Sequence, residues 1–436
     1  MVKTYKIVTF GCQMNQSDSE RIAATLKNLG YRKSKSDQTA DLWVFNACSV
    51  RQAGIDRIYG QIENLRRLKT PNYKPKIVIT GCLLPKDRQK FVRLFDLVFN
   101  IRDLPDLPRL LQNLEKSRAR LSLAQSVTST DLSYFKILPQ RQSRFFGLVP
   151  ISFGCSRFCT FCAVPYTRGL EIDRSGEEIL AEVKKLIKDG FKEIWLLGQT
   201  ASSWKDPKNP QYQFVDLLSD ICKIPGRFWL RFTSPYLLDF DDELIAFLAK
   251  NEKVSRHWNL PLQSGSNKIL AKMNRKYTVE KYWEILGKIK NKIPDFSFST
   301  DIIVGFCGET KNDFQQTYDF FAKIKPTMAF IARYSPRPGT VSQKLFKDNV
   351  SPQIKKVRYQ KLTKLLRQVA RENLEKEVGR QLEVLVDSWL PLKKECLGKT
   401  RNYKTVRFKS QKSLVGQFVS VKIIGRREFE LAGQLI

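Results

Sequence analysis

The chain has 436 residues, of which 42% are hydrophobic, and this length is typical of two or three domains. It carries 76 Lys and Arg against 43 Asp and Glu, and the net charge of +33 favours a polyanionic partner such as nucleic acid over a small cation. Nine cysteines are too few for a disulfide scaffold in a chain of this length. No apolar run is long enough for a membrane span, and the first ten residues do not resemble a signal peptide. We therefore expect a cytoplasmic protein with reduced thiols.

Residues 1 to about 100 alternate short apolar segments with helical ones. Predicted buried strands are 5–10, 42–46, 76–80 and 97–100. Helical spacing of apolar residues appears between them, at 19–30 and 56–68. Because strands that alternate with helices form parallel sheets, this part is predicted to be a small doubly wound α/β domain.

Three cysteines follow the predicted strands of this first part at equivalent places. Cys12, Cys48 and Cys82 stand at or just beyond strand ends, in the contexts TFGC, FNAC and ITGC. The carboxyl ends of parallel strands share one edge of a sheet, where ligands bind. A single cysteine at a strand end is often only a small buried residue. Three at equivalent positions favour a metal or cluster site.

A polar connection over 101–146 leads to a second series of strands and helices. Predicted strands are 147–153, 193–198, 228–233, 257–262, 296–305 and 328–335. Six strand–helix units predict a barrel or part of one, with functional groups at the carboxyl ends of the strands.

A second group of three cysteines follows the first of these strands, in ISFGCSRFCTFC. Cys155, Cys159 and Cys162 are spaced C-x3-C-x2-C, which leaves a tetrahedral zinc site one ligand short. The only histidine, His257, is about a hundred residues away and is more typical of a packed residue. The alternative is an iron–sulfur cluster, for which cysteine thiolates are the usual ligands and in which one iron would stay open for a small molecule.

The last part of the chain begins with a basic amphipathic helix, predicted over 352–378. Short strands with turns follow it and predict a small antiparallel barrel. Basic residues outnumber acidic ones more than two to one in 380–436, as in many nucleic-acid modules. In GKTRNYKTVRF, Lys399 and Arg401 are predicted to neutralise phosphates and Tyr403 to stack on an unpaired base. A purely structural appendage is the alternative.

The C-x3-C-x2-C motif, with Phe161 before its last cysteine, resembles the radical S-adenosylmethionine superfamily. Longer motifs in the same order resemble its methylthiotransferase family: TFGCQMNQSDSERI, FNACSVR, GCSRFCTFCAVPYTRG, LPLQSGSNKIL, STDIIVGFCGET and YSPRPGT. The resemblance implies an α/β fold of three domains. These are an N-terminal doubly wound parallel-sheet domain over 1–125, a central partial (β/α) radical barrel over 141–372, and a C-terminal small antiparallel β-barrel, called TRAM, over 376–436.

The resemblance also implies two [4Fe–4S] clusters. Cys155, Cys159 and Cys162 would hold the first, whose open iron binds S-adenosylmethionine and cleaves it to a 5′-deoxyadenosyl radical. The strand-end cysteines Cys12, Cys48 and Cys82 would hold the second, which is thought to present the inserted sulfur. The implied reaction adds a methylthio group to carbon 2 of N6-isopentenyladenosine, next to the anticodon of a tRNA. Sister enzymes act on threonylcarbamoyladenosine in tRNA or on a ribosomal protein. From another class, a zinc-binding RNA-binding protein without catalysis remains the alternative.

By the same resemblance, further residues are expected at the site, although each also has a structural reading. Those expected to bind the cofactor are Phe161, Gln199, Gln263, Ser264, Asp301 and Arg333. Tyr166 and Arg168 are expected to contact RNA. Expected partners are the tRNA anticodon stem-loop, a flavodoxin or ferredoxin as electron donor, and a sulfur donor that the sequence does not identify; the protein is expected to be a monomer.

Three cysteines match no cluster motif. Cys307 takes the place of a proline in the family motif and is predicted to be a small buried residue. Cys222 and Cys396 are predicted to be structural.

Overall fold

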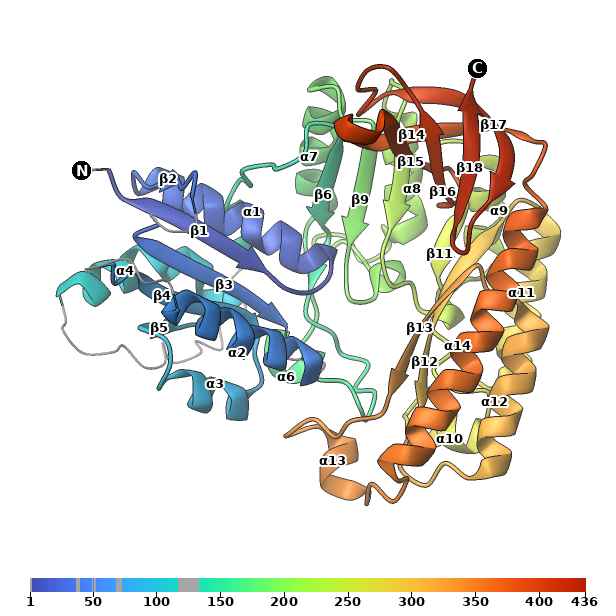
Figure 1. Cartoon of the computed structure of the whole chain (residues 1–436), viewed down its shortest axis with the longest axis horizontal. Helices are drawn as coiled ribbons and strands as arrows, with labels where there is room; N and C mark the ends of the chain where they lie inside the picture. The colour runs from blue at the N-terminus through green and yellow to red at the C-terminus, as the bar shows by residue number, and fades with distance from the viewer. Residues whose placement is uncertain (1, 37–39, 49, 51, 68–72, 117–132) are drawn as a thin grey trace. The chain divides into compact units, whose positions relative to one another are not determined.

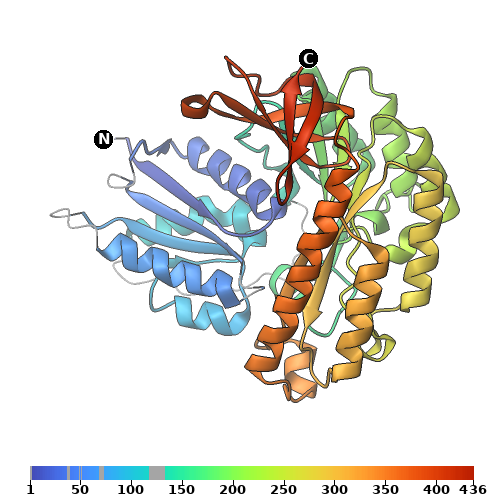
Figure 2. The ribbon, with the colours of Figure 1, turned by 45° about the vertical axis from the view of Figure 1, so that its right-hand side comes forward.

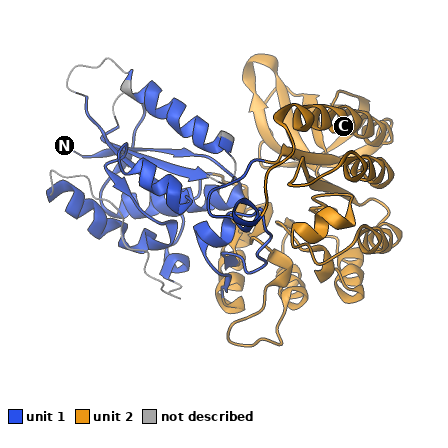
Figure 3. Ribbon diagram, turned by 90° about the horizontal axis from the view of Figure 1, so that it is seen from below, with its two compact units in different colours: residues 1–142, 152–174, 335–345 blue, residues 143–151, 175–334, 346–436 orange. Residues whose placement is uncertain are grey.

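The structure is a computed structural model that describes residues 2–36, 40–48, 50, 52–67, 73–116 and 133–436 (Figure 1). It contains two compact units (Figure 3). Unit 1 comprises residues 1–142, 152–174 and 335–345, and unit 2 comprises residues 143–151, 175–334 and 346–436. The predicted domain boundaries remain a prediction.

Unit 1 is built on a five-stranded parallel sheet. The strand order is β2 (Arg32–Lys33), β1 (Thr4–Thr9), β3 (Leu42–Cys48), β4 (Lys76–Cys82) and β5 (Leu97–Val98). The connecting helices are α1 (Gln13–Asn28), α2 (Gln52–Arg66), α3 (Pro85–Phe91), the 3-10 helix η1 (Ile101–Asp106) and α4 (Leu107–Lys116).

The sheet of unit 1 is buried on both faces, as the near-continuous apolar runs of its strands predict. Val44 belongs to a core that includes residues of α1 and α4, whereas its neighbour Phe45 belongs to a second core with residues of α2 and α3. Successive side chains of a strand point to opposite faces, so β3 contributes to both cores. The predicted doubly wound arrangement is confirmed.

Shorter elements complete unit 1. They are α5 (Ser133–Lys136), the antiparallel pair β7 (Ser152–Phe153) and β8 (Ile172–Asp173), α6 (Val164–Arg168) and α13 (Val341–Leu345). Helix α6 packs against β4. The C-x3-C-x2-C segment therefore lies in the same compact unit as the strand-end cysteines.

Unit 2 contains two three-stranded parallel sheets. One has the order β10 (Trp229–Phe232), β9 (Glu193–Leu197), β6 (Phe146–Pro150), and the other β11 (His257–Asn259), β12 (Ser297–Val304), β13 (Met328–Arg333). A parallel bridge between Leu230 and Val254 continues the first sheet towards the second. The helices between the strands are α7 (Gly176–Lys188), η2 (Ala201–Ser203), α8 (Phe214–Lys223), η3 (Leu237–Asp239), α9 (Asp242–Lys250), α10 (Asn267–Lys272), α11 (Val279–Lys292) and α12 (Lys311–Ile324).

Polar side chains fix where these helices begin. Ser175, Asp241 and Thr278 each accept a hydrogen bond from a backbone N–H in the first turn of α7, α9 and α11. The long helix α14 (Pro352–Glu375) begins in the same way at Ser351, with proline at its first position. It runs beside α12 and over β13 (Figures 1 and 2). Its apolar side packs into the core of the two parallel sheets of unit 2 through Leu362, Leu365, Leu366 and Val369.

The chain ends in a closed five-stranded barrel. Its strands are β14 (Gln381–Leu390), β15 (Glu395–Thr400), β16 (Thr405–Lys409), β18 (Glu430–Leu435) and β17 (Phe418–Arg426), in that order around the barrel, with the 3-10 turn η4 (Pro391–Lys393) between the first two. All pairings are antiparallel except that of β16 with β18, which is parallel. The predicted fold class is confirmed. No helix in the described part of the chain is both long and apolar enough to cross a membrane.

Candidate active site

Three strand-end cysteines of unit 1 lie together at the edge of the sheet where its strands end. Cys48 and Cys82 are the last residues of β3 and β4 and are paired in register. Cys12 directly precedes α1, after Gly11, whose φ is 127°. A Cβ on Gly11 would lie 3.2 Å from the Cβ of Cys48, so glycine permits this close approach. The predicted meeting of the three cysteines is confirmed.

The three thiols alter one another's ionisation. A hydrogen bond from Cys82 lowers the pKa of Cys48 to about 7, against the effect of burial. Burial raises the pKa of Cys12, and the neighbouring Cys82 raises it further. The pKa of Cys82 is raised by its hydrogen bond to Cys48 and by burial, while the charge of Arg168 opposes the increase. Thiolates held this close repel one another unless a cationic group binds between them, so this donor set fits a metal cluster.

A cluster and a single ion place different demands on such thiols. Among the described residues, no three His, Cys, Asp or Glu side chains are arranged to hold one metal ion. In a [4Fe–4S] cluster each cysteine thiolate binds a separate iron. The three thiols along the strand ends supply the donors for such a cluster and would leave one iron free of protein ligands.

Two buried amides lie against these thiols. Asn15 Nδ2 donates to Asn46 Oδ1 at 3.1 Å and lies 4.0 Å from Cys82 Sγ, and the Cys12 thiol donates to Asn15 Oδ1 at 3.6 Å. Asn46 Nδ2 in turn donates to the Asn15 carbonyl and to Ser19 Oγ. Neighbours of this kind orient ligands and tune the metal. Sequence reasoning missed both residues, although the fixed positions of the amides in GCQMN and FNAC were a usable signal.

Arg168 does not lie where an RNA-binding residue would. Its guanidinium is buried in unit 1, where Nε donates to Cys82 Sγ at 3.0 Å and Nη2 pairs with Asp18 at 2.5 Å. Asp18 is also buried and accepts a short hydrogen bond from the Tyr134 hydroxyl. A buried side chain offers no surface to a polyanion, so the RNA contact predicted for Arg168 is withdrawn.

The C-x3-C-x2-C segment of unit 1 is shaped by its backbone. Cys155 N–H donates to the Gly169 carbonyl at 3.1 Å, and a Cβ on Gly154 would lie 2.1 Å from the Leu170 carbonyl oxygen. Phe158, between the first two cysteines, has a φ of 48°, which is uncommon for a bulky residue and is often found at functional sites.

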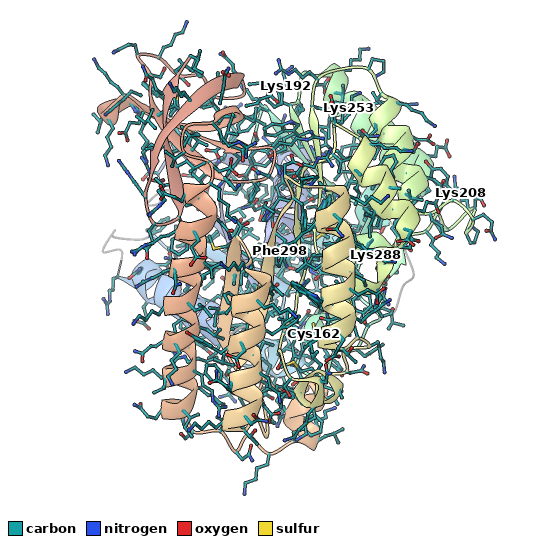
Figure 4. The ribbon with its side chains drawn as sticks, turned by 90° about the vertical axis from the view of Figure 1, so that its right-hand side faces the viewer. Cys162, Lys192, Lys208, Lys253, Lys288 and Phe298 are labelled. Atoms are coloured by element: carbon teal, nitrogen blue, oxygen red, sulfur yellow. The ribbon has the colours of Figure 1, made fainter. Side chains whose placement is uncertain are left out.

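The second half of the segment leads into α6. Val164 N–H donates to Cys162 Sγ at 3.4 Å, and the Thr160 carbonyl accepts from Ser342 N–H at 2.7 Å (Cys162 is labelled in Figure 4). Cys155 is buried, whereas Cys159 and Cys162 are half-buried. Phe161 and Tyr166, predicted to contact cofactor and RNA, are also half-buried here. Three thiols on so short a fixed loop fit one cluster.

In unit 2, Gln263 has the features of a ligand-binding residue. Its φ is 69°, and its side chain is 8% exposed. Its Oε1 is buried without a hydrogen-bond partner within the described residues. A buried polar atom of this kind is costly unless a ligand or water satisfies it. The backbone places Gln263 beside Asp301, because Gln263 N–H donates to the Asp301 carbonyl at 2.7 Å.

The other cofactor candidates of unit 2 differ in their surroundings. Asp301 Oδ2 accepts from Asn259 Nδ2 at 2.8 Å. Ser264 turns towards α12, where its Oγ lies 3.3 Å from Thr317 Oγ1 and accepts from Ser266 N–H. Gln199, half-buried, follows β9, and Arg333, exposed, ends β13. The structure therefore brings Gln263 and Asp301 together and gives Ser264 a local role.

Two of the three RNA candidates of the small barrel, Arg401 and Tyr403, contact the sheets of unit 2, whereas Lys399 bonds within the barrel. Arg401 donates through Nε and Nη2 to the carbonyls of Val254 and Asn251, at 3.1 and 2.8 Å. The Tyr403 ring stacks on His257 at 5.3 Å, and Lys399 Nζ donates to Thr405 Oγ1.

These residues form a turn that packs against the sheets through buried groups. Arg231, almost fully buried, donates to the carbonyls of Thr400 and Arg401. It also pairs with Glu193, the first residue of β9. Arg401 and Tyr403 thus help to join the small barrel to the sheets, while the RNA contacts predicted for Lys399, Arg401 and Tyr403, all half-buried, stay predictions.

The remaining cysteines lie in packed surroundings in unit 2. Cys307 and Cys396 are buried, and Cys222 is half-buried. Burial raises the pKa of Cys307, and it raises that of Cys222 to about 12. Such thiols are poor nucleophiles and poor metal ligands at neutral pH, which agrees with the structural roles predicted for them.

Comparison with protein families gives three matches along the chain. Residues 4–100 match uncharacterized protein family UPF0004, residues 149–321 match the Radical SAM superfamily, and residues 375–436 match the TRAM domain. The Radical SAM match implies a [4Fe–4S] cluster and S-adenosylmethionine as cofactors.

Solved structures share the fold at low sequence identity. The radical S-adenosylmethionine methyltransferase TsrM from Kitasatospora setae aligns with a TM-score of 0.54 at 13% identity, covering 79% of this chain and 74% of that one. The cobalamin-dependent radical enzyme OxsB aligns with a TM-score of 0.51 at 14% identity, covering 84% of this chain and 61% of that one.

Curated relatives align over the whole length. Proteins from Dictyoglomus thermophilum and Carboxydothermus hydrogenoformans are each 38% identical, covering 99% and 100% of this chain and 98% and 99% of their own. Both are named tRNA-2-methylthio-N(6)-dimethylallyladenosine synthase. The chain therefore belongs to the MiaB-type methylthiotransferase family of radical S-adenosylmethionine enzymes, as its motifs predicted.

Proposed function

We propose that this protein converts N6-isopentenyladenosine in tRNA to its 2-methylthio derivative, using S-adenosylmethionine for both radical formation and methyl transfer. The observation that carries the proposal is that one compact unit holds two separate groups of three cysteines. The names of the full-length relatives support the same substrate. An unactivated aromatic C–H bond needs a radical, and the new C–S bond needs a sulfur source, so two cluster sites suit this reaction.

Cys155, Cys159 and Cys162 would hold the first [4Fe–4S] cluster. When bound there, the cluster supplies the electron that cleaves S-adenosylmethionine bound at its open iron. The chain's own contribution is to hold the three thiols on a fixed loop and to offer polar groups to S-adenosylmethionine. We assign that second role to Gln263 and Asp301, with Gln199 and Arg333 as further candidates at strand ends.

Cys12, Cys48 and Cys82 would hold a second [4Fe–4S] cluster, from which the inserted sulfur comes. The support is the shared strand edge, the mutual effects of the thiols on their pKa values, and the Asn15 amide, which lies against the sulfur atoms and is held by Asn46. A flavodoxin or ferredoxin would supply electrons to a monomeric enzyme in the cytoplasm.

For tRNA, we assign binding to an exposed row of cations on α14. The α14 basic face consists of Lys356, Lys361, Lys364, Arg367 and Arg371, all exposed and spaced so that neighbours lie three to five residues apart. Three of them, with Arg426 of β17, line a shallow groove of about 520 Å³, which Glu372 and Glu375 also line. Side chains three and four apart share one helix face, so this face offers a polyanion several exposed cations, of which Arg367 also pairs with Glu428.

Mass spectrometry of tRNA nucleosides tests the proposed reaction. The chain would be expressed in a bacterium that lacks its own methylthiolating enzyme, beside a Cys155→Ala variant as control. We expect 2-methylthio-N6-isopentenyladenosine with the intact chain and unmodified N6-isopentenyladenosine with the variant. If the isopentenyl nucleoside persists although both clusters are filled, the substrate assignment is wrong. Methylthiolated threonylcarbamoyladenosine in the same data, or a modified ribosomal protein, would then identify the sister activities. Zinc in place of iron would identify a non-catalytic RNA-binding protein.

A further inference from the structure

Arg168 connects the C-x3-C-x2-C segment to a cysteine of the other group. We propose, on the basis of the two-cluster function above, that Arg168 is a positioning residue that directs a positive hydrogen-bond donor at the Cys82 sulfur and thereby raises the reduction potential of the second cluster. Helix α6 starts directly after Cys162 and Ala163 and ends at Arg168, so one short helix spans from one cysteine group to the other.

The orientation of the guanidinium is fixed on several sides. Asp18 holds Nη2, and Tyr134 in turn holds Asp18 through its hydroxyl. The ring of Phe153 lies 5.0 Å from the guanidinium carbon. These contacts leave Nε aimed at Cys82 Sγ, 3.0 Å away. The Arg168 and Asp18 side chains are both 0% exposed, so solvent does not weaken their charges.

One donor of Arg168 remains for a bound group. Nη1 is buried and has no hydrogen-bond partner within the part of the chain that the structure describes. A buried donor of this kind is costly to leave unpaired. A sulfur atom of a group held by Cys82 would satisfy it, because Nη1 and Nε belong to the same planar fork. Arginine can therefore donate hydrogen bonds to the Cys82 thiolate and to the neighbouring sulfur of the bound group at the same time, in a planar geometry that lysine does not offer.

The two buried charges are expected to act on a cluster in opposite directions. Reduction adds negative charge to a cluster, and a nearby positive charge stabilises the reduced form. Loss of the Arg168 charge should shift the potential to more negative values. Loss of the Asp18 charge, with Arg168 still present, should shift it to more positive values. A purely structural role of the pair predicts no such reversal of sign.

The test isolates the second cluster by changing Cys155, Cys159 and Cys162 to alanine. In this background the Arg168→Met, Arg168→Lys and Asp18→Asn variants would be reconstituted anaerobically. Iron and sulfide are counted first, and the potential is then measured by a redox titration followed by electron paramagnetic resonance. We expect a negative shift for Arg168→Met, a smaller one for Arg168→Lys and a positive shift for Asp18→Asn.

Arg102→Met is the matched control. Arg102 lies over the same Phe153 ring, 5.2 Å from it, but its Nη2 donates to the Leu170 carbonyl. The Arg102→Met variant should therefore shift the potential less than Arg168→Met does.

Equal potentials in the parent and in the Arg168 and Asp18 variants would overturn the proposal, as would shifts of the same sign in both. If Arg168→Met fails to bind iron, the Asp18→Asn variant still tests the proposal, because its reduction potential must shift to more positive values. If the parent itself binds no cluster, the proposed second cluster is refuted, and this is distinguishable from a failure of Arg168 alone.

Discussion

Gln263 combines a left-handed backbone with an unsatisfied buried oxygen, and both features predict a ligand contact. We expect Gln263→Ala to weaken S-adenosylmethionine binding by about tenfold, the loss of roughly one hydrogen bond. The fold should persist, because the bridge between Gln263 and Ile302 uses only backbone groups. Equilibrium dialysis of the anaerobically reconstituted protein with labelled S-adenosylmethionine measures the change.

Ser264→Ala is the matched control for this measurement. The Ser264 hydroxyl is satisfied by Thr317 and by the backbone of Ser266, so it has a local role. We expect its removal to leave the affinity for S-adenosylmethionine almost unchanged. An equal loss in both variants would contradict the different roles given to these adjacent residues.

Asp103, in η1, is a buried carboxyl that makes unit 1 sensitive to pH. Burial raises its pKa to about 6 from 3.8, and its Oδ2 has no hydrogen-bond partner in the described structure. Between these two values the folded chain binds more protons than the unfolded chain, so the free energy of unfolding falls as the pH rises from about 4 to about 6.

Asp103→Asn should remove this pH dependence. At pH 7 we expect the variant to raise the free energy of unfolding by about 1–3 kcal/mol, because an amide carries no charge to bury. Urea-dependent hydrogen exchange on peptides from η1 and α4 measures unit 1 directly. At pH 4 the parent and the variant should converge. A constant difference at both pH values would show that the charge is not the cause.

Single residues at the site were predictable where they follow a strand end or a compact motif. The two groups of three cysteines could be singled out as candidate cluster ligands from their spacing and strand positions, and the family resemblance then implied two clusters. Arg168 could not be placed correctly, because its partner Asp18 lies 150 positions earlier in the chain and burial of the pair depends on packing of α6 against β4. Asn15 and Asn46 stand in GCQMN and FNAC but were overlooked, because the letters alone do not show that the fold brings Asn15 against a thiol and Asn46 against Asn15.

At the level of elements, the turn at 400–404 makes structural contacts, and its predicted RNA contact stays a prediction. It packs beside His257, the only histidine in the chain. Burial lowers the pKa of His257 to about 3, and the charges of Arg231, Lys399 and Lys404 add to this effect. The native protein should therefore keep this imidazole neutral well below pH 6.

Nuclear magnetic resonance of the histidine ring tests this contact. In the parent we expect no titration between pH 5 and 8. In a Tyr403→Ala variant the ring loses its stacking partner, and its pKa should move towards the ordinary value of about 6.5. Since the folded pKa is lowered, this group contributes stability that is lost as the pH falls below about 6.5. A parent that titrates near 6.5 would contradict the buried contact.

The α14 basic face has the opposite character, because its cations are exposed. We expect Lys364→Glu and Arg371→Glu to weaken binding of an anticodon stem-loop. Each should lower the slope of log affinity against log salt by roughly 0.7–0.9 for every phosphate that the helix no longer neutralises. Fluorescence anisotropy at several salt concentrations gives both quantities.

A charge reversal elsewhere on unit 2 provides the control. Lys208 pairs with Glu177 at the surface, and Figure 4 shows it at the edge of the molecule away from α14. Lys208→Glu changes the net charge by the same amount and should leave the salt slope unchanged. Equal effects at both places would mean that only the overall charge attracts RNA.

Apolar periodicity predicted the helices and most strands, and the strands that it did not predict have physical reasons. β15, with the sequence ECLGKT, has a glycine and few β-branched residues, so its own sequence does not predict a strand, and the pairing with β14 and β16 creates it. β2 has only two residues and exists only as an edge partner of β1. In both cases tertiary pairing overrides a weak local signal.

On the scale of the whole molecule, hydrogen bonds and ion pairs join segments that are distant in sequence. Residues 335–340 of the YSPRPGT segment belong to unit 1, where Arg337 pairs with Asp87 of α3 and donates to Gln52 of α2. These helices follow Cys82 and Cys48. Ser342, shortly after this segment, bonds to Thr160 between Cys159 and Cys162. Residues 337–342 thus contact the segments that follow or contain both cysteine groups, and no local sequence pattern predicts these contacts.

The two proposed cluster sites of unit 1 predict a definite metal content. Anaerobic reconstitution should give about eight iron and eight sulfide per chain. A variant with Cys155, Cys159 and Cys162 changed to alanine should keep about four of each, and so should a variant with Cys12, Cys48 and Cys82 changed, because each group is held by its own backbone. The sixfold variant should hold neither. If the parent holds about four iron and only one of the triple variants loses them, the other group holds no cluster. If that group is Cys12, Cys48 and Cys82, the sulfur would have to reach the nucleoside from outside this chain.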